Sequence, residues 1–203
     1  TNLEALSPAF ANPGDMNALM QTSADFTGLL ATDVLNLSLD GETTFYNPTS
    51  VAVNKAGTRA YVTNTSITIE ASGIYEVNLI TGKRSMLSAY SIGSGPNIFT
   101  PDNIVLNPSE TKLYLNPYNN SKTYEVDIAS GNRRLVYESL SGNLDGLAVS
   151  RDGEDLYILL GAGASLDRIN IQSGQKYMVS SADRGGGPSF SYPVAVELGK
   201  TGN

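Results

Sequence analysis

Apolar and polar positions alternate in the same way in three stretches of the chain. Each stretch starts with a short alternating run, passes through a turn-forming tetrapeptide and continues into a second run. In every copy a tyrosine lies ten residues after the first apolar position. Alternation with a period of two, broken by Gly, Pro and acidic residues, predicts a strand, a tight turn and a second antiparallel strand. The stretches are TSVAVNKAGTRAYVTN (49–64), DNIVLNPSETKLYLNP (102–117) and DGLAVSRDGEDLYILL (145–160).

A third and a fourth strand are expected after each of these pairs. The chain continues as IYEVNLITGKR, TYEVDIASGNR and LDRINIQSGQK, where an alternating run ends in a glycine turn. In each copy that glycine lies five residues after an apolar position: Val77 and Gly82, Val126 and Gly131, Ile169 and Gly174. The continuations RSMLS, RRLVY and KYMVS supply the fourth strand.

Four short antiparallel strands that recur every 43 to 53 residues are typical of β-propeller blades. The alternative all-β repeat is a sandwich, whose strands do not recur with equal internal spacings. We therefore expect an all-β protein, a β-propeller with about three complete four-stranded blades and partial blades at both ends.

A second repeated element joins one unit to the next. GSGPNIFTP (93–101) and GGGPSFSYP (185–193) share their proline spacing, and SPAFANP (7–13) repeats it. Proline fixes φ and lacks an amide donor, which suits the start of an inner strand. The expected starts of the inner strands are Pro13, Pro48, Pro101 and Pro193, with Leu144 in the equivalent place.

These positions predict the blade boundaries within one propeller over residues 1–203. We expect a degenerate blade at 13–47, blades at 48–100, 101–143 and 144–192, and the beginning of a further blade at 193–203. Both termini then fall inside blades. The expectation is that further blades of the same protein, or another chain, complete the ring.

Composition narrows the function classes. The chain has no cysteine and no histidine, which excludes disulfides, thiol catalysis and imidazole-based triads. A net charge of -7 disfavours binding to nucleic acid and to anionic lipid. No uninterrupted apolar run is long enough for membrane insertion. The acidic, cysteine-free, Ser/Asn/Thr/Gly-rich sequence favours an extracytoplasmic location: periplasmic, cell-surface or secreted.

The repeat resembles bacterial propellers of the NHL-like and lactonase-like (regucalcin-gluconolactonase-like) kind. The matching residues are PTSVAVN, AYV and EVNLITGKR in one unit and DGLAVS, LYI and RINIQSGQK in another. The resemblance covers about residues 45–203 and implies the propeller architecture. It implies no single function, because such repeats serve adhesion, scaffolding, ligand binding and hydrolysis.

The same resemblance suggests a metal site. LDGLAVSRDG is similar to a segment whose inner strand begins with a metal-binding aspartate at the mouth of the central channel. Asp145 matches that aspartate, and Asp102 matches it one unit earlier, so the implied cofactor is calcium held by two carboxylates. Thr49 and Val194 stand at the equivalent places of other units. The alternative is that both aspartates merely start strands, with no bound cofactor.

Other features have mainly structural interpretations. The basic residues at the start of the fourth strands, Arg84, Arg133, Arg134 and Lys176, are expected on the solvated outer edge. The repeated tyrosines are expected to pack between blades rather than to stack on sugars. No catalytic residue is identified. Binding specificity is expected in the loops between second and third strands, at Thr65, Ser66, Thr68, Tyr118, Asn119 and Asn120.

Three functions are compatible with the sequence. The favoured one is a non-catalytic extracytoplasmic propeller that binds a protein or glycan partner or forms an assembly through its loops. The second is a calcium-dependent lactonase-like hydrolase that uses Asp102 and Asp145. The third is a structural subunit of a surface filament or complex.

Overall fold

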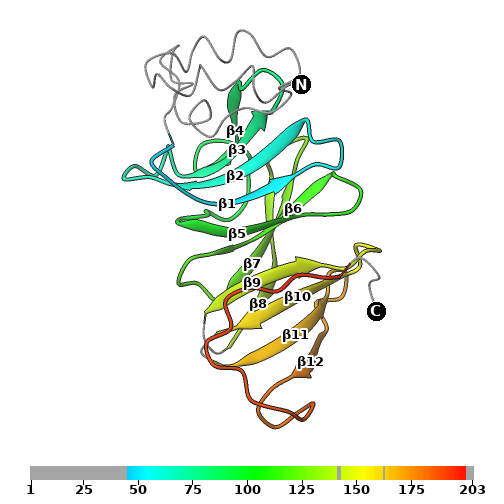
Figure 1. Ribbon diagram of the computed structural model, residues 1–203. Coiled ribbons are helices and arrows are strands. Elements are labelled where there is room, and N and C mark those ends of the chain that lie inside the picture. The colour runs from blue at the N-terminus through cyan, green and yellow to red at the C-terminus, as the bar shows by residue number, and fades with distance from the viewer. Residues whose placement is uncertain (1–44, 141–142, 162, 200–203) are drawn as a thin grey trace, which may run out of the picture.

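The computed structural model describes residues 45–140, 143–161 and 163–199, and all its regular elements are strands (Figure 1). The first sheet contains β1 (Asn47–Val53), β2 (Arg59–Thr65), β3 (Gly73–Asn78) and β4 (Arg84–Ala89). The second contains β5 (Pro101–Leu106), β6 (Lys112–Pro117), β7 (Lys122–Asp127) and β8 (Arg133–Glu138). The third contains β9 (Leu144–Val149), β10 (Asp155–Leu160), β11 (Ser165–Asn170) and β12 (Lys176–Ser180).

Each sheet is an antiparallel meander in which consecutive strands are neighbours. Figure 1 shows the three sheets arranged one after another, with the inner strands β1, β5 and β9 on a common side. β1 contacts β5, and β5 contacts β9, so the inner strands of successive sheets are adjacent. The predicted all-β fold with three four-stranded blades is confirmed. Within the described ranges no helix is long and apolar enough to cross a membrane.

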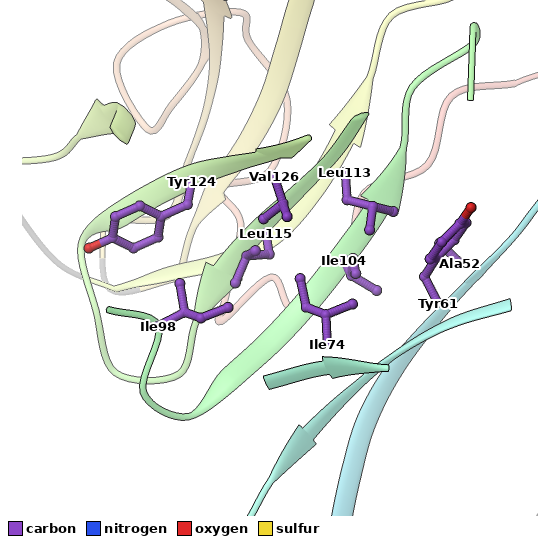
Figure 2. Close-up of a cluster of buried hydrophobic side chains, with 9 residues drawn as sticks. All are labelled: Ala52, Tyr61, Ile74, Ile98, Ile104, Leu113, Leu115, Tyr124 and Val126. Carbon is purple, nitrogen blue, oxygen red and sulfur yellow. The ribbon is translucent and has the colours of Figure 1, made fainter. Parts of the chain in front are cut away.

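The hydrophobic core lies between the sheets rather than inside one of them. Figure 2 shows the cluster between the first and second sheets, where Ile74 of β3 lies near Leu115 and Val126. A second cluster joins the second sheet to the third through Tyr114 and Ile158. Tyr61 and Tyr114 are almost fully buried, as expected for tyrosines that pack between blades, whereas the third repeated tyrosine, Tyr157, is only partly buried. Burial of these faces is what holds the blades side by side.

The turns predicted after the third strands are present. Gly82, Gly131 and Gly174 have φ values of 72°, 70° and 68°, a conformation that glycine adopts without strain. The preceding Asn78 accepts hydrogen bonds from the amides of Ile80 and Thr81 through Oδ1. Such local side-chain acceptors stabilise tight turns.

An ion pair between the second and third strands recurs in all three sheets. Arg59 pairs with Glu76 at 3.1 Å and Lys112 with Glu125 at 2.8 Å. In the third sheet the signs are exchanged, because the arginine stands on the third strand. The equivalent pair there is Asp155 with Arg168, at 2.7 Å. The position therefore requires opposite charges across two strands and not a particular residue on either.

The expectation of a fully solvated basic edge is wrong for two of its residues. Arg84 and Arg133, the first residues of β4 and β8, are buried, whereas Arg134 beside them is half exposed. Arg84 lies 4.8 Å from the centre of the Phe45 ring, a cation–π contact. Arg133 is enclosed by the linker that leaves the preceding sheet. The sequence places both arginines on outer strands, but the linker 90–100 folds over Arg133 and the Phe45 ring lies against Arg84.

The predicted starts of the inner strands agree with the structure at Pro101 and Leu144, and β1 begins one residue before Pro48. Pro13 and residues 13–44 of the predicted degenerate blade lie outside the described residues. Residues 193–199 form no strand, yet they run beside β9 (Figure 1), and Ala195 lies close to Gly146. The predicted blade boundaries stay predictions.

Candidate functional site

One end of the sheets gathers the loops that the sequence marked for binding. In each meander the loop between the second and third strands lies at the same end as the start of the inner strand, because Asn47 pairs with Thr65 and Pro101 with Pro117. We call this end the linker face. It consists of the loops 66–72 and 118–121, of residues 161, 163 and 164, and of the described residues directly before β1, β5 and β9.

The loop 118–121 is held between two linkers by hydrogen bonds. The Tyr118 amide donates to the Thr100 carbonyl at 2.8 Å, and the Thr100 hydroxyl donates to the Tyr118 carbonyl at 3.3 Å. On the other side, Asn143 Nδ2 donates to Asn119 Oδ1 at 2.9 Å. The Ser139 amide donates to the Ser121 carbonyl at 2.7 Å. These bonds fix the loop to both neighbouring linkers.

The loop 66–72 is held by hydrogen bonds between its own residues. Ser72 Oγ accepts from the Ser66 amide at 2.8 Å and donates to the Thr68 carbonyl at 3.1 Å. The fully buried Asn64 donates from Nδ2 to the Ala71 carbonyl and accepts from the Tyr46 amide through Oδ1. A buried amide thus ties this loop to the linker before β1.

Large apolar side chains are exposed on the linker face. Tyr46 is 64% exposed, Phe99 52%, Tyr118 70% and Ile67 80%. Tyr46 and Phe99 occupy equivalent places, two residues before Pro48 and Pro101, and each follows a buried apolar residue. The repeat therefore presents an outward aromatic ring at the same point of two successive linkers.

Charge is distributed unequally between the two ends of the sheets. Among the described linker-face loops the charged residue is Glu70, and Asp102, Asp145 and the ion pair of Lys122 with Glu138 stand at strand ends beside the face. The turns at the opposite end carry both signs of charge. They contain Lys55, Lys83, Glu110, Arg151, Asp152 and Glu154. The linker face is therefore the weakly charged, aromatic end of the described structure.

A hollow of about 600 Å³ lies beside the inner strands, between β1, β5 and residues 195–197. Its walls include Val51, Ile104 and Val196, so its middle is apolar. A second hollow, lined by Lys55, Glu110 and other residues of the turns, marks the opposite end.

The two predicted metal ligands stand at the linker-face end of the inner strands. Thr63 Oγ1 donates to the Asp102 carbonyl at 2.8 Å, and Asn103 Nδ2 donates to the Asp145 carbonyl at 2.7 Å. Burial and the nearby charge of Asp145 raise the pKa of Asp102 above its ordinary value. The structure therefore brings the two carboxyl groups close enough for the charge of Asp145 to disfavour ionisation of Asp102.

The oxygen donors around this carboxylate pair decide how well calcium would fit. Two carboxylates supply at most about four of the six to eight oxygens that calcium takes. In the described part of the chain no three His, Cys, Asp or Glu side chains gather to hold a metal. Backbone oxygens or water would have to complete the coordination, so the metal role of Asp102 and Asp145 stays a prediction.

Asp102→Asn is expected to stabilise the protein at neutral pH in the absence of calcium. The raised pKa means that native Asp102 holds its proton more tightly than the unfolded chain does. Its ionisation therefore costs stability as the pH rises above the ordinary value of 3.8, and the variant avoids that cost. Thermal midpoints measured with EDTA from about pH 3 to about pH 8 should diverge upward for the variant as the pH rises.

Asp152→Asn is a control with the opposite sign. Asp152 Oδ1 accepts from Ser150 Oγ and from the Glu154 amide, and these bonds lower its pKa. Its ionised form therefore stabilises the fold above the ordinary pKa, and the substitution should lower the midpoint at neutral pH. Equal shifts of the same sign in both variants would contradict the interaction between Asp102 and Asp145.

The remaining predicted binding residues all lie at the linker face, but in different settings. Thr65, Ser66 and Thr68 belong to the ordered end of β2 and its loop, while Tyr118 is strongly exposed. Asn119 has a φ of 53° and bonds to Asn143, and the Asn120 carbonyl accepts from the Leu144 amide. None of these observations tests ligand binding.

Sequence reasoning missed Tyr46 and Phe99. The signal was present in the segments FYNP and IFTP, where a buried apolar residue is followed by an exposed aromatic one before the proline. The glycines and prolines make the linker repeat visible in the sequence, whereas nothing in their spacing distinguishes an outward ring from an inward one.

Comparison with known proteins supports the fold. No family model matches the chain, and no curated protein matches it. Among solved structures, the chain is similar to a hydrazine synthase from Kuenenia stuttgartiensis, with a TM-score of 0.59 and 17% identity over 81% of this chain and 43% of that one. It is also similar to a chain of a nidogen/laminin complex, with a TM-score of 0.58 and 18% identity over 74% of this chain and 52% of that one.

A Bacteroides thetaiotaomicron protein of unknown function is similar as well, with a TM-score of 0.56 and 16% identity over 73% of this chain and 41% of that one. The chain thus spans about half, or less, of the length of the solved chains that it matches. At such identities the similarity concerns the fold alone. The neighbours are β-propeller proteins, and the four-stranded sheets described above are β-propeller blades.

Proposed function

We propose that this β-propeller is a non-catalytic, extracytoplasmic scaffold that binds a protein or glycan partner through its linker face. The observation that carries the proposal is the exposure of Tyr46, Phe99, Tyr118 and Ile67 at one end of the sheets. Exposed apolar side chains that gather in one region, and not singly, are typical of interaction surfaces. Aromatic residues contribute most of the binding energy at such surfaces.

The order of the loops supports the same proposal. Loop 118–121 is bonded to two linkers, and loop 66–72 is bonded through Asn64 and Ser72. A partner that binds loops already fixed by hydrogen bonds spends little free energy on ordering them. Specificity then resides in loops on a rigid sheet scaffold, which is the usual arrangement for binding proteins.

Composition supports a partner other than nucleic acid. The net charge of -7 opposes a polyanion. The acidic chain without cysteine accords with an extracytoplasmic location, which fractionation of the source cells would test.

A matched pair of surface variants tests the proposal. The triple variant Tyr46→Ser, Phe99→Ser, Tyr118→Ser removes the rings of the linker face, and Ile80→Ser with Tyr177→Ser removes exposed apolar side chains elsewhere. Both are compared with the unaltered chain on an array of glycans and purified extracellular proteins. The proposal expects binding that the triple variant loses and the control keeps. Binding that survives the triple variant contradicts it.

A calcium-dependent lactonase-like hydrolase is the second candidate, favoured by the proximity of Asp102 and Asp145. Calcium would there supply a charge that polarises a substrate carbonyl. Titration with calcium should release or absorb heat and raise the thermal midpoint of the unaltered chain, and Asp102→Asn should abolish both effects. The absence of any response in the unaltered chain removes this candidate.

A further inference from the structure

We infer that the linker face binds an uncharged polysaccharide chain, laid across the rings of Tyr46, Phe99 and Tyr118. This inference rests on the proposed function and specifies its partner. It depends on three features of the described structure: where the rings stand, which polar groups surround them, and how little charge lies nearby.

The positions of the three aromatic rings suit a ligand built from repeating units. Tyr46 and Phe99 each lie two residues before the proline at the start of an inner strand, Pro48 in β1 and Pro101 in β5, so the blade repeat itself sets their separation. Tyr118 joins Phe99, because its amide and carbonyl bond to Thr100, the residue that follows Phe99. A polymer of identical units can place one unit on each ring. An aromatic face gains free energy from an apolar surface laid on it, and one face of a pyranose ring presents C–H groups.

The polar groups beside the rings match hydroxyls. Asn119, Asn120 and Asn143 lie together, and the Asn119 and Asn143 side chains are hydrogen-bonded to each other. An amide carries two donor hydrogens and an oxygen with two lone pairs, so one bond leaves further capacity. Thr65, Ser66 and Thr68 add hydroxyls beside the neighbouring ring Tyr46, whose amide bonds to Asn64 in the same blade. Amides and hydroxyls pair with sugar hydroxyls in both directions.

The scarcity of charge selects an uncharged glycan. Residues 90–100, 118–121, 139, 140 and 143 contain no Lys, Arg, Asp or Glu, whereas loop 66–72 contains Glu70 and Lys122 follows loop 118–121. An anionic polysaccharide would meet Lys122, which is already paired with Glu138 at 3.4 Å, and it would approach a protein of net charge -7. A protein partner is less well matched, because the rims of protein interfaces are polar and commonly carry complementary charges.

Affinity electrophoresis of the full chain tests the inference. Native gels would contain hydroxyethylcellulose, laminarin, mannan or dextran as uncharged probes, and alginate as an anionic one. We expect retardation in at least one uncharged gel and none in alginate. Phe99→Ala and Tyr118→Ala should each weaken the binding about tenfold, as expected for the loss of one stacked ring.

Tyr177→Ala is the matched control, since Tyr177 is a half-exposed tyrosine on β12, away from the linker face. It should bind as the unaltered chain does, and unchanged circular dichroism of all variants shows that they fold. No retardation in any uncharged gel, or equal losses in Tyr177→Ala, overturns the inference. If a protein on the array still depends on the linker-face rings, the proposed function stands without the glycan. If no ligand on the array depends on the linker-face rings, both the glycan inference and the proposed function fail.

Discussion

Replacing Arg133 with methionine is expected to lower the free energy of unfolding by about 3 to 5 kcal/mol, one of the two largest effects that we expect from a single substitution in this chain. Arg133 is only 6% exposed, although it begins an outer strand. Its Nε donates to the Pro96 carbonyl at 2.7 Å. Its Nη1 donates to Ser88 Oγ and to the carbonyls of Ala89 and Ile92, at 2.8, 2.7 and 2.6 Å.

All four acceptors belong to the end of β4 and the linker that follows it, whereas Arg133 belongs to the next blade. The side chain therefore joins two blades. Burial lowers the pKa of Arg133, because removal from water disfavours the cation. Its acceptors are neutral, so hydrogen bonds rather than a carboxylate offset part of the cost of burying the charge. Methionine fills much of the volume but donates no hydrogen bond, and a buried acceptor without a donor costs about 1 to 3 kcal/mol.

The close approach of the backbones leaves little room for compensation. A Cβ at Gly93 would collide with the Gly131 carbonyl, and a Cβ at Gly95 would collide with the Arg133 carbonyl. The linker is thus packed directly onto the start of β8. Ser88 and Ala89 at the end of β4 are fully buried, whereas Ile92 and Pro96 lie in the exposed part of the linker, so the cost of losing the donor falls mainly on the β4 end of the site.

Denaturant unfolding at neutral pH measures this effect. Arg151→Met is the control, because Arg151 is exposed and makes one bond, to the Gly199 carbonyl at 3.2 Å. It should change stability by less than about 1 kcal/mol. Arg133→Lys should recover only part of the loss, since an ammonium does not reproduce the planar fork. A loss no greater for Arg133→Met than for Arg151→Met would show that the buried bonds are not stabilising.

Arg133 also shows where sequence reasoning reached its limit. Four strands per repeat, the glycine turns and the starts of β5 and β9 follow from local spacing, because they depend on neighbours within a few residues. The burial of Arg133 depends on a linker that arrives from the preceding sheet and covers it, and Arg84 contacts the ring of Phe45, which lies before β1. No periodicity within a single blade contains that information.

Of the candidate site, too, only the features that depend on local sequence could be predicted. Loop 118–121 could be predicted as a binding loop, since it joins two strands of a rigid sheet. Its bonds to Thr100 and Asn143 could not, because they come from two linkers. The spacing also placed Asp102 and Asp145 at equivalent positions, yet only the stacking of β5 on β9 brings their carboxyl groups within electrostatic reach.

Lys176→Met is expected to destabilise the protein by about 3 to 5 kcal/mol at neutral pH, because it leaves the carboxylate of Asp167 buried without its cation. Asp167 of β11 is fully buried, and Lys176 Nζ lies 2.6 Å from its Oδ2. Apart from this ion pair, neither carboxylate oxygen has a hydrogen-bond partner in the described part of the chain. Burial lowers the pKa of Lys176, but Asp167 outweighs burial and holds it above the ordinary value.

The surroundings of Asp167 are those of an apolar core position. It pairs in register with Ile158 on one side and Met178 on the other, and Tyr75 and Tyr124 occupy the equivalent place in the other sheets. The repeat thus needs bulk at this place and not charge. The double variant Asp167→Leu, Lys176→Met should therefore regain the stability that Lys176→Met loses, or exceed that of the unaltered chain, as with other buried ion pairs replaced by apolar residues.

A double-mutant cycle from denaturant unfolding would measure the interaction between the two side chains. Lys122→Met is the matched control, since Lys122 pairs with Glu138 at 3.4 Å where both side chains are exposed, and its loss should be below about 1 kcal/mol. Additive single losses, with a double variant less stable than Lys176→Met, would refute this expectation. Because Lys176 is stabilised in its charged form, the contribution of the pair should be complete from neutral pH up to about pH 10.5 and disappear as the pH rises beyond it.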